Sequence, residues 1–506
     1  MADLLTRRQF LRAAGGVTFL ALKPTGTGLF AAPGPDVPVL PLFTVLPYIQ
    51  PGPAGVLVDG RESLVLAWQT LARPADFAVT FGPSRAYGST AQVTATPRFS
   101  GDAGEGEPRL NYTATLARLS LNRTYYYRVH GNGRVLAEGY LRTRKPRGVP
   151  TRFVAFGDNS FGDLSDRAIA YQAYRARPDF VMNTGDNVYD GGLDNEYARY
   201  FFPVYNCSEA GPTIGAPLLR SVPFYTVIAN HDVHARDAQR RPVADFDRDP
   251  DSLAYYTTMS LPLNGPDPAH PTPTVGPDER LAEFRRAAGP RFPRQANYAF
   301  DYGDAHFLCL DANVYVDPTD PALQAWIEND LSGTDALWKF VVYHHPAFNV
   351  GAEHYREQHM RVLSPLLERH GVDIALHGHE HTYQRTKPLR FAPTDPSRAA
   401  AVDAADRRVP GTFTVDHAFD GKTRTRPAGI IYVTTGAGGK HLYDVDYTGD
   451  PSKWVHPDDA SVPYVANFVS DRHSLTAFEL DGRRLTMAQI DESGQEIDRI
   501  TVTKAG

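Results

Sequence analysis

The sequence has few cysteines, little excess of either charge and no long apolar run. Its 506 residues contain 2 Cys, and 52 Lys and Arg stand against 58 Asp and Glu, for a net charge of −6. Two cysteines exclude a fold built on disulfides, and the lack of a basic block argues against nucleic acid or an anionic membrane surface as a partner. No apolar run reaches the roughly eighteen residues that a membrane span needs. We expect a large globular protein of two to four domains at about 150 residues each, with its oligomeric state left open.

The first 32 residues resemble an export signal rather than part of a fold. Residues 6–11 read Thr-Arg-Arg-Gln-Phe-Leu, a weakly apolar stretch follows at 13–22, and small residues at 31–32 suit cleavage. A twin arginine before such a stretch is typical of twin-arginine translocation. We therefore expect a periplasmic or extracellular protein, with an ordinary amphipathic helix as the alternative for this segment.

The sequence leaves open whether Cys207 and Cys309 form a disulfide. Export would bring both to a compartment in which a disulfide can form. Cys309 lies in the apolar segment 306–310, however, and a buried free thiol is the usual outcome for such a position.

Short segments of alternating polarity lie between residues 40 and 146. The predicted strands are at 64–68, 77–81, 125–129 and 135–141, separated by turn residues. Short strands at this spacing, with no convincing helix among them, predict a β-sandwich of about 100 residues. Residues 119–129, which contain three consecutive tyrosines, resemble the strand-entry tyrosine region of fibronectin type III domains.

Apolar strands alternate with helices after Pro150. Strands are predicted at 152–156, 179–183, 224–228, 338–343 and 372–376, and helices at 165–177, with Ser165 as N-cap, and at 357–370. This alternation indicates an α/β layered domain. Near the end of the chain, Asp481-Gly482 is expected to turn a hairpin between 474–480 and 485–490. Two stretches rich in proline and aspartate, near 233–295 and 386–427, interrupt the pattern.

Polar residues follow five of these strands at their carboxyl ends. They lie at 157–160, 185–189, 229–232, 344–346 and 377–381, and they supply aspartate, asparagine, tyrosine and histidine side chains. Because ligands of α/β sheets bind beyond the carboxyl ends of strands, we expect the five segments to converge. Taken singly, each segment has an ordinary structural interpretation, such as a helix cap or a core histidine. Together, carboxylate, imidazole and amide suit a divalent or trivalent cation.

The order of these segments resembles the calcineurin-like metallophosphoesterases, and more narrowly the purple acid phosphatases, over residues 152–491. The matching residues are Asp158, Gly185-Asp186-Asn187-Val188-Tyr189, Asn230-His231-Asp232, His344 and Gly378-His379-Glu380-His381. Tyr189 separates the narrower family from the wider one, most of whose members lack this tyrosine. The resemblance implies an α/β four-layer metallophosphoesterase sandwich, with two mixed sheets flanked by helices, over 150–495. It also implies that 40–146 is the fibronectin type III-like N-terminal domain of this family.

The same resemblance implies a binuclear metal site. Asp158, Tyr189 and His381 would hold Fe(III), Asn230, His344 and His379 would hold a divalent metal (Zn, Fe or Mn), and Asp186 would bridge the two. The chain departs from the family pattern at Ser160 and Ala229, where the family usually has glycine. The two long insertions also lack a clear counterpart.

The implied activity is that of an acid phosphatase. Its substrates would be small phosphate esters, and it would hydrolyse phosphomonoesters by attack of a metal-bound hydroxide. Two cations neutralise charge in the transition state, and a trivalent ion lowers the pKa of bound water enough for acidic pH. His231 is the expected general acid. Asp232 is expected either to orient His231 or to be a surface carboxylate. His345 is expected behind the metal ligands, and Tyr383 and Gln384 either line the site or pack in the core.

His354 is a further expected catalytic residue. In plant-type members of the family, the loop after the strand-end histidine carries a pair of histidines that face the phosphate. Here His354 takes the second place of that pair and Glu353 the first. A protonated His354 would bind non-bridging phosphate oxygens, and Glu353 would repel dianionic monoesters and favour diesters. A solvated loop histidine is the alternative.

Other functions remain open from the sequence. A phosphodiesterase or nucleotidase uses the same bimetal site, because only the pocket walls decide between these substrates. Alkaline phosphatase D-like phosphodiesterases share the export signal and the use of iron. An inactive surface-binding protein is disfavoured, because every expected ligand is present and His231 is intact.

Overall fold

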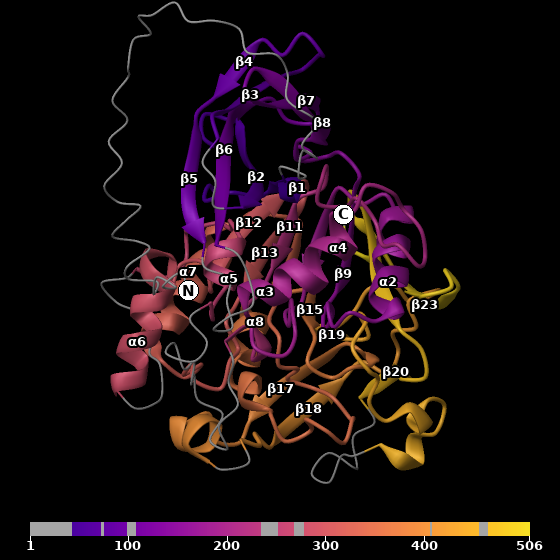
Figure 1. Cartoon of the computed structure of the whole chain (residues 1–506). Coiled ribbons are helices and arrows are strands. Elements are labelled where there is room, and N and C mark those ends of the chain that lie inside the picture. Colours follow the sequence, from indigo (N-terminus) through magenta and orange to yellow (C-terminus); the bar gives the residue numbers. More distant parts are fainter. Residues whose placement is uncertain are drawn as a thin grey trace, which may run out of the picture.

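The structure is a computed structural model that describes residues 43–71, 75–98, 108–233, 251–267, 278–404, 407–454 and 464–505 (Figure 1). The expected export segment at 1–32 lies outside these residues, as do parts of the stretch at 233–295. Within the described ranges, no helix is both long enough and apolar enough to cross a bilayer.

Two antiparallel four-stranded sheets form the expected N-terminal β-sandwich. One sheet has the order β1 (Phe43–Gln50), β2 (Glu62–Leu71), β6 (Arg109–Leu119) and β5 (Val93–Arg98). The other has the order β4 (Ser89–Ala91), β3 (Phe77–Gly82), β7 (Thr124–Gly131) and β8 (Arg134–Arg142). The Tyr125 hydroxyl accepts a hydrogen bond from the Ser120 amide at 3.0 Å. This contact ties the start of β7 to the preceding corner, as in the tyrosine corner of immunoglobulin-like sandwiches.

Two mixed sheets form the larger part of the molecule. The first has the order β11 (Phe224–Thr226), β10 (Phe180–Asn183), β9 (Thr151–Phe156), β21 (Ser474–Asp481), β22 (Arg484–Asp491) and β23 (Glu496–Thr503). The second has the order β12 (Tyr298–Tyr302), β13 (Ala305–Cys309), β14 (Trp338–Val342), β15 (Ile374–His377), β19 (Ile431–Thr435), β16 (Tyr383–Thr386) and β20 (Val465–Val469). A two-stranded sheet of β17 (Leu389–Pro393) and β18 (Gly411–Val415) lies in the stretch at 386–427. Antiparallel pairing of β21 with β22 confirms the predicted hairpin.

Short helices connect these strands. They are α2 (Leu164–Arg175), α3 (Asp194–Glu196), α4 (Phe202–Tyr205), α5 (Tyr255–Thr258), α6 (Asp278–Ala288), α7 (Pro321–Gly333) and α8 (Ser364–Arg369). Ser165 is not the N-cap of α2, because Asp163 holds that position and the Ser165 hydroxyl donates to the Gly439 carbonyl. The helix predicted at 357–370 is also wrong in extent. A 3-10 turn at His359–Leu363 comes first, and α8 starts anew with Pro365 in its first turn, where proline is tolerated.

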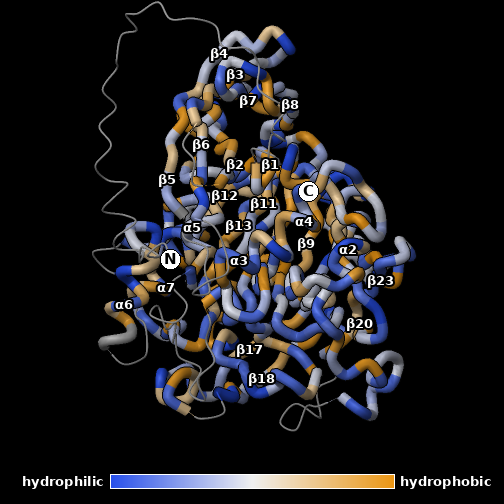
Figure 2. Tube along the Cα trace, viewed as in Figure 1, coloured by the Kyte–Doolittle hydropathy of each residue, from blue (hydrophilic) through white to orange (hydrophobic). Residues whose placement is uncertain are grey.

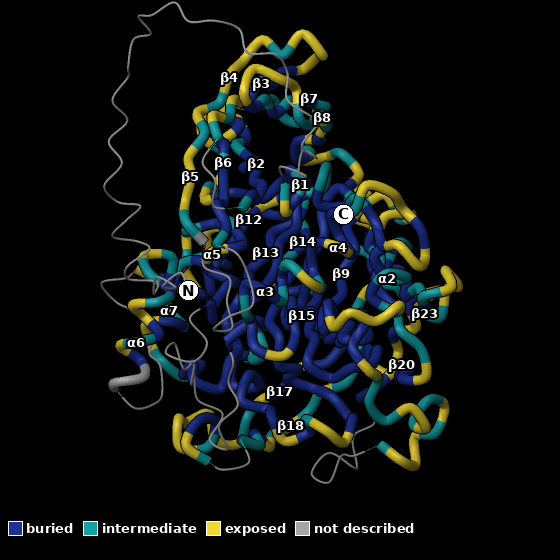
Figure 3. Tube along the Cα trace, in the orientation of Figure 1, coloured by how far each residue is buried: buried dark blue, intermediate teal, exposed yellow. Residues whose placement is uncertain are grey.

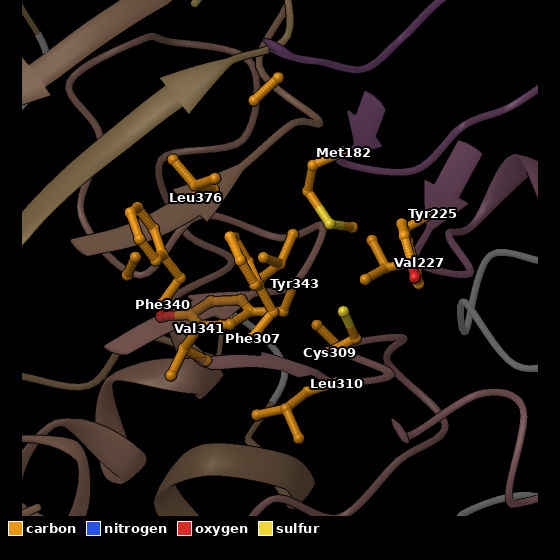
Figure 4. Close-up of a cluster of buried hydrophobic side chains, with 14 of the residues drawn as sticks. Met182, Tyr225, Val227, Phe307, Cys309, Leu310, Phe340, Val341, Tyr343 and Leu376 are labelled. Atoms are coloured by element: carbon orange, nitrogen blue, oxygen red, sulfur yellow. The ribbon is translucent and has the colours of Figure 1, made fainter. Parts of the chain in front are cut away.

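The two mixed sheets face each other across an aromatic core. Phe153 of β9 meets Phe340 of β14 edge-on, with ring centroids 5.3 Å apart. Figure 4 shows Met182 of β10 opposite Cys309 of β13 in this core. The apolar segments of Figure 2 coincide there with the buried segments of Figure 3. Cys309 is buried and free, as expected, and Cys207 is free as well.

Buried polar contacts join the β-sandwich to the mixed sheets. Arg144, after β8, pairs with Glu62 of β2 at 3.0 Å and donates to the Asp301 carbonyl of β12 at 2.9 Å. Arg109 of β6 forms an ion pair with Asp194 of α3. Because buried charges are tolerated only when they are paired in good geometry, these contacts fix where the sandwich sits. The predicted fold class, a β-sandwich followed by two mixed sheets with helices, is confirmed.

Candidate metal centre

The five polar loops at the carboxyl ends of β9, β10, β11, β14 and β15 meet in one buried cluster. The Asp158 carboxylate accepts a hydrogen bond from the His379 amide at 3.0 Å. The Asp186 carboxylate accepts one from the His231 amide at 3.0 Å, and its Oδ2 lies 3.3 Å from His344 Nε2. The predicted convergence of the five segments is therefore found in the structure.

Left-handed backbone conformations place several of these side chains. Asp158, Asp186 and His379 have φ values of 58°, 51° and 70°, and Ser160 has 61°. Such values are uncommon for residues other than glycine and cluster at functional sites. Ser160 thus keeps the backbone conformation that suits glycine at this family position. Gly378 is needed for close approach, since a Cβ there would lie 2.5 Å from Asp158 Oδ2.

The Tyr189 hydroxyl is the focus of one half of the cluster. It lies 3.0 Å from the Asp186 carboxylate, 3.3 Å from the Asp158 carboxylate and 3.3 Å from His381 Nε2. All four side chains are buried. Carboxylate, phenol and imidazole donors that meet at one point form a ligand set for a metal ion.

A second half of the cluster adjoins the first. Asp186, His344 and His379 bring ligand atoms within 4.8 Å of one another. Asn230 precedes His231, and its Oδ1 is buried with no hydrogen-bond partner among the residues that the structure describes. A buried amide oxygen without a partner is costly, and a cation in this cluster would satisfy it.

Hydrogen bonds hold one ring nitrogen of each candidate histidine ligand. Nδ1 of His344 and of His381 contacts a backbone carbonyl, at 2.8 Å and 2.7 Å, so Nε2 is left for a metal. His379 is held at its other nitrogen, since its Nε2 lies 3.0 Å from the Glu357 carboxylate. Metal-ligating histidines are oriented by such contacts at the second nitrogen.

Burial makes the negative charge of this cluster costly without a cation. It raises the pKa of Asp158 well above its usual range, and burial together with the carboxylates of Asp186 and Asp158 raises the pKa of Tyr189. Asp186 has a lowered pKa despite its burial, because His344 and His231 lie close to it. A bound cation reverses the balance, since it compensates carboxylates and favours the phenolate. The residues present therefore fit a metal centre.

His231 lies at the more open side of the cluster. It is only partly buried, and its ring centroid lies 4.4 Å from that of Tyr189. Its Nδ1 lies 3.0 Å from the Asp190 carbonyl. A carbonyl only accepts hydrogen bonds, so Nδ1 carries the proton of a neutral ring and Nε2 is left to exchange one with a substrate.

Asp232 has neither of the two roles expected of it. It is fully buried, so it is not a surface carboxylate, and it accepts hydrogen bonds from the Asn187 side chain and the Ala229 amide. Burial raises its pKa to about 8. The Asp190 carbonyl orients His231 instead. Asp232 fixes two of the loops behind the metal centre, which its position next to His231 in the sequence did not reveal.

Parts of this chain are similar in sequence to known phosphoesterases. Residues 151–383 match the family model described as Calcineurin-like phosphoesterase. Purple acid phosphatase 17 of Arabidopsis thaliana is 26% identical over 249 residues, 47% of this chain and 66% of that protein. Tartrate-resistant acid phosphatase type 5 of Sus scrofa is 25% identical over 270 residues, 49% of this chain and 69% of that protein. The match to purple acid phosphatase 18 of Arabidopsis thaliana spans 26% of that protein.

Solved structures share the fold. A purple acid phosphatase from yellow lupin (Lupinus luteus) seeds aligns with a TM-score of 0.63 at 17% identity, over 90% of this chain and 74% of that chain. PhoD aligns with a TM-score of 0.54 at 13% identity, over 93% of this chain and 94% of that chain. Part of this chain is thus similar in sequence to the calcineurin-like phosphoesterases, and among them to purple acid phosphatases, and the chain shares the fold of a purple acid phosphatase.

His354 lies against a candidate ligand, so it is not a solvated loop residue. Its ring centroid is 3.8 Å from that of His379, and its Nδ1 is 3.5 Å from the Glu357 carboxylate. The His354 amide donates to the buried Glu380 carboxylate at 2.9 Å. The side chain of Glu353, one residue earlier, is exposed.

Glu357 and Lys440 are two residues near the centre that the sequence patterns missed. Glu357 lies 3.0 Å from Nε2 of His379 and 3.6 Å from Nε2 of His345, which places His345 behind the ligands as expected. Lys440 is buried, with Nζ 4.4 Å from the centroid of the Tyr189 ring. In the sequence, Glu357 follows His354 by three residues, and Lys440 follows a glycine-rich run at 436–439. Neither pattern is specific enough to indicate a residue near a metal site.

Three other residues near the centre are structural. Nδ1 of His377 lies 3.3 Å from the Tyr343 carbonyl, and burial lowers the pKa of His377 to about 3. The Tyr383 hydroxyl donates to the Asp498 carboxylate at 2.7 Å. Gln384 accepts a hydrogen bond from a backbone amide at 3.0 Å. Of the two roles expected for Tyr383 and Gln384, the structure therefore favours packing in the core.

Proposed function

We propose that this protein is a binuclear metal-dependent phosphatase that hydrolyses phosphomonoesters at acidic pH. The observation that carries the proposal is the Tyr189 hydroxyl within 3.3 Å of two aspartate carboxylates and one imidazole. Bound cations in this site neutralise the charge of a phosphate ester and acidify water. The assigned ligands are Asp158, Tyr189 and His381 for Fe(III), Asn230, His344 and His379 for a divalent Zn, Fe or Mn ion, and Asp186 as the bridge.

His231 donates the proton that the leaving alkoxide needs. Its Nδ1 is held by the Asp190 carbonyl, and its partly exposed ring lies beside Tyr189 at the edge of the cluster. A general acid must reach the substrate while a second contact fixes its ring. His231 meets both conditions without being a ligand itself.

His354 and Glu353 set the preference between monoesters and diesters. His354 packs on His379, so its ring can reach the non-bridging oxygens of a phosphate bound to the centre. Glu353 is exposed at the same loop, where its charge opposes a dianionic monoester more than a singly charged diester. Phosphodiesterase activity is therefore the second candidate function.

A visible absorption spectrum combined with metal analysis tests the assignment of iron to Tyr189. We expect iron and one divalent metal in the purified protein, with a broad charge-transfer band. Tyr189→Phe should lose the band while its circular dichroism stays normal. Tyr443→Phe is the matched control, because Tyr443 stacks on His381 at 4.0 Å without contributing its hydroxyl to the cluster contacts of Tyr189. A colourless, active, metal-replete wild type would contradict the iron–tyrosine assignment and leave a generic metallophosphoesterase.

We further propose export through the twin-arginine route, on the basis of residues 6–11. Replacing Arg7 and Arg8 by lysine should retain the protein in the cytoplasm. Normal export of this double variant, measured by cell fractionation, would count against the route.

A further inference from the structure

Lys440 places a positive charge against the ring of Tyr189. Its Nζ lies 4.4 Å from the centroid of the Tyr189 ring and 3.2 Å from that of Phe161. The lysine side chain is only 8% exposed. A buried ammonium group is costly unless negative charge or aromatic faces offset the loss of water. The two rings supply such faces, so the lysine is held close to the candidate iron ligand.

Backbone contacts fix the position of Lys440. Its amide donates to the Asp158 carbonyl at 2.9 Å, and its carbonyl lies 3.0 Å from Nε2 of His473. The Nζ contact with the Asp190 carboxylate is long, at 3.4 Å, and the Asp190 side chain is 47% exposed. Water therefore screens this ion pair. Besides this carboxylate, the ammonium lies over two aromatic rings, and one of them is Tyr189.

We propose that Lys440 tunes the electron donation of Tyr189 to the iron, an inference that rests on the proposed function. A cation over the face of a phenolate lowers the energy of its electrons. The phenolate then gives less electron density to the metal, so its charge-transfer band lies at higher energy. The same effect raises the reduction potential of the iron, since groups behind a ligand tune the metal through it.

Lys440→Met tests this role, because methionine keeps an unbranched apolar side chain and removes the charge. In the iron-loaded enzyme we expect the charge-transfer band to move to longer wavelength and the reduction potential of the iron to fall. Lys440→Arg keeps a cation over the ring and should return both values toward those of wild type. A purely structural lysine would leave the band position unchanged in every variant that binds iron.

Lys504→Met is the matched control. Lys504 Nζ lies 4.9 Å from the centroid of the Trp338 ring and 2.7 Å from the Asp373 carboxylate, so it repeats the lysine–aromatic contact away from the metal centre. Its removal should leave the band in place.

The outcomes separate the two proposals. A wild type without a charge-transfer band refutes the iron–tyrosine assignment. A band in wild type that stays in place in Lys440→Met overturns the tuning role alone. Should Lys440→Met fail to fold or to hold iron, Lys440→Gln replaces it. An unshifted band in the glutamine variant likewise overturns the inference, and a band shifted to longer wavelength supports it.

Discussion

The candidate metal centre and a second cluster, around the buried His306, are both built from histidine and aspartate, yet the ring nitrogens of their histidines have different contacts. At His306 both ring nitrogens are engaged, Nδ1 by Asp301 at 2.8 Å and Nε2 by Asp330 at 2.7 Å. In the candidate metal centre, Nδ1 of His344 and of His381 contacts a backbone carbonyl, and Nε2 of each lies near a carboxylate of the cluster. The partners of the ring nitrogens, rather than residue type, distinguish the two sites.

The two clusters also differ in whether their own residues compensate the buried charge. Burial alone would lower the pKa of His306, but its two carboxylate partners raise it to about 9, so the cluster compensates its own charge. In the metal centre, burial raises the pKa of Asp158 and of Tyr189, and no lysine or arginine pairs with their oxygens in the described part of the chain. A bound cation would compensate the carboxylates of that site.

The largest effect is expected from Asp186→Asn, which removes the proposed bridge. We expect both metals to be lost, activity to fall to background, and stability to fall by about 4 kcal/mol for each metal if the metals are present at roughly a thousand times their Kd. Metal analysis, turnover and denaturant unfolding measure the three effects. Asp330→Asn, in the His306 cluster, should keep both metals and the activity. Full metal content in Asp186→Asn would contradict the bridging role.

His231→Asn should have the next largest effect. We expect normal metal content and a loss of roughly 10²–10⁴ in turnover for esters with poor leaving groups, the usual range for a general acid. The loss should be smaller for activated esters such as nitrophenyl phosphate, because their leaving group needs little protonation. Equal losses for both kinds of ester would instead assign His231 to metal binding or folding.

His306→Asn should affect stability and leave the metal centre intact. The folded-state pKa of His306 is about 9 against 6.5 unperturbed, so its contribution is fully present below pH 6.5 and is lost as pH rises through 9. We expect a destabilisation on the order of 3 kcal/mol at pH 6 that becomes much smaller at pH 10. Denaturant unfolding of both proteins at the two pH values checks this.

His354→Ala should have the smallest effect. We expect KM for monoesters to rise about tenfold, the value of one charge-assisted hydrogen bond near 1.5 kcal/mol, with metal content unchanged. Glu353→His should improve monoester turnover relative to diester turnover, because it removes a negative charge. Steady-state kinetics on both ester classes checks the pair. Wild-type kinetics in both variants would place the loop outside the substrate site.

Much of the fold was predictable because strand periodicity depends on local sequence. The alternating segments became the β-sandwich, and the apolar segments at 152–156 and 338–343 became β9 and β14 within a residue or so. Helix ends were less predictable. Ser165 fits an N-cap by residue type, but its hydroxyl bonds to Gly439, far along the chain.

Some residues of the candidate site were likewise predictable from the sequence, and others were not. The residues that meet around Tyr189 were predictable, because each stands at the carboxyl end of a recognisable strand. Asp232, Glu357 and Lys440 were not, because their roles depend on partners from other loops. Asp232 is adjacent to His231 in the sequence, yet its hydrogen bonds go to Asn187 and Ala229.

Local periodicity and chain topology were enough to predict the order of strands and helices along the chain and the residues that converge at the strand ends. Only folding settles which partner each histidine nitrogen meets, which carboxylates are already satisfied, and where Lys440 places its charge. The physical reason is that burial, hydrogen bonding and electrostatic balance are sums over neighbours from distant segments. Those neighbours are defined only when the chain has folded.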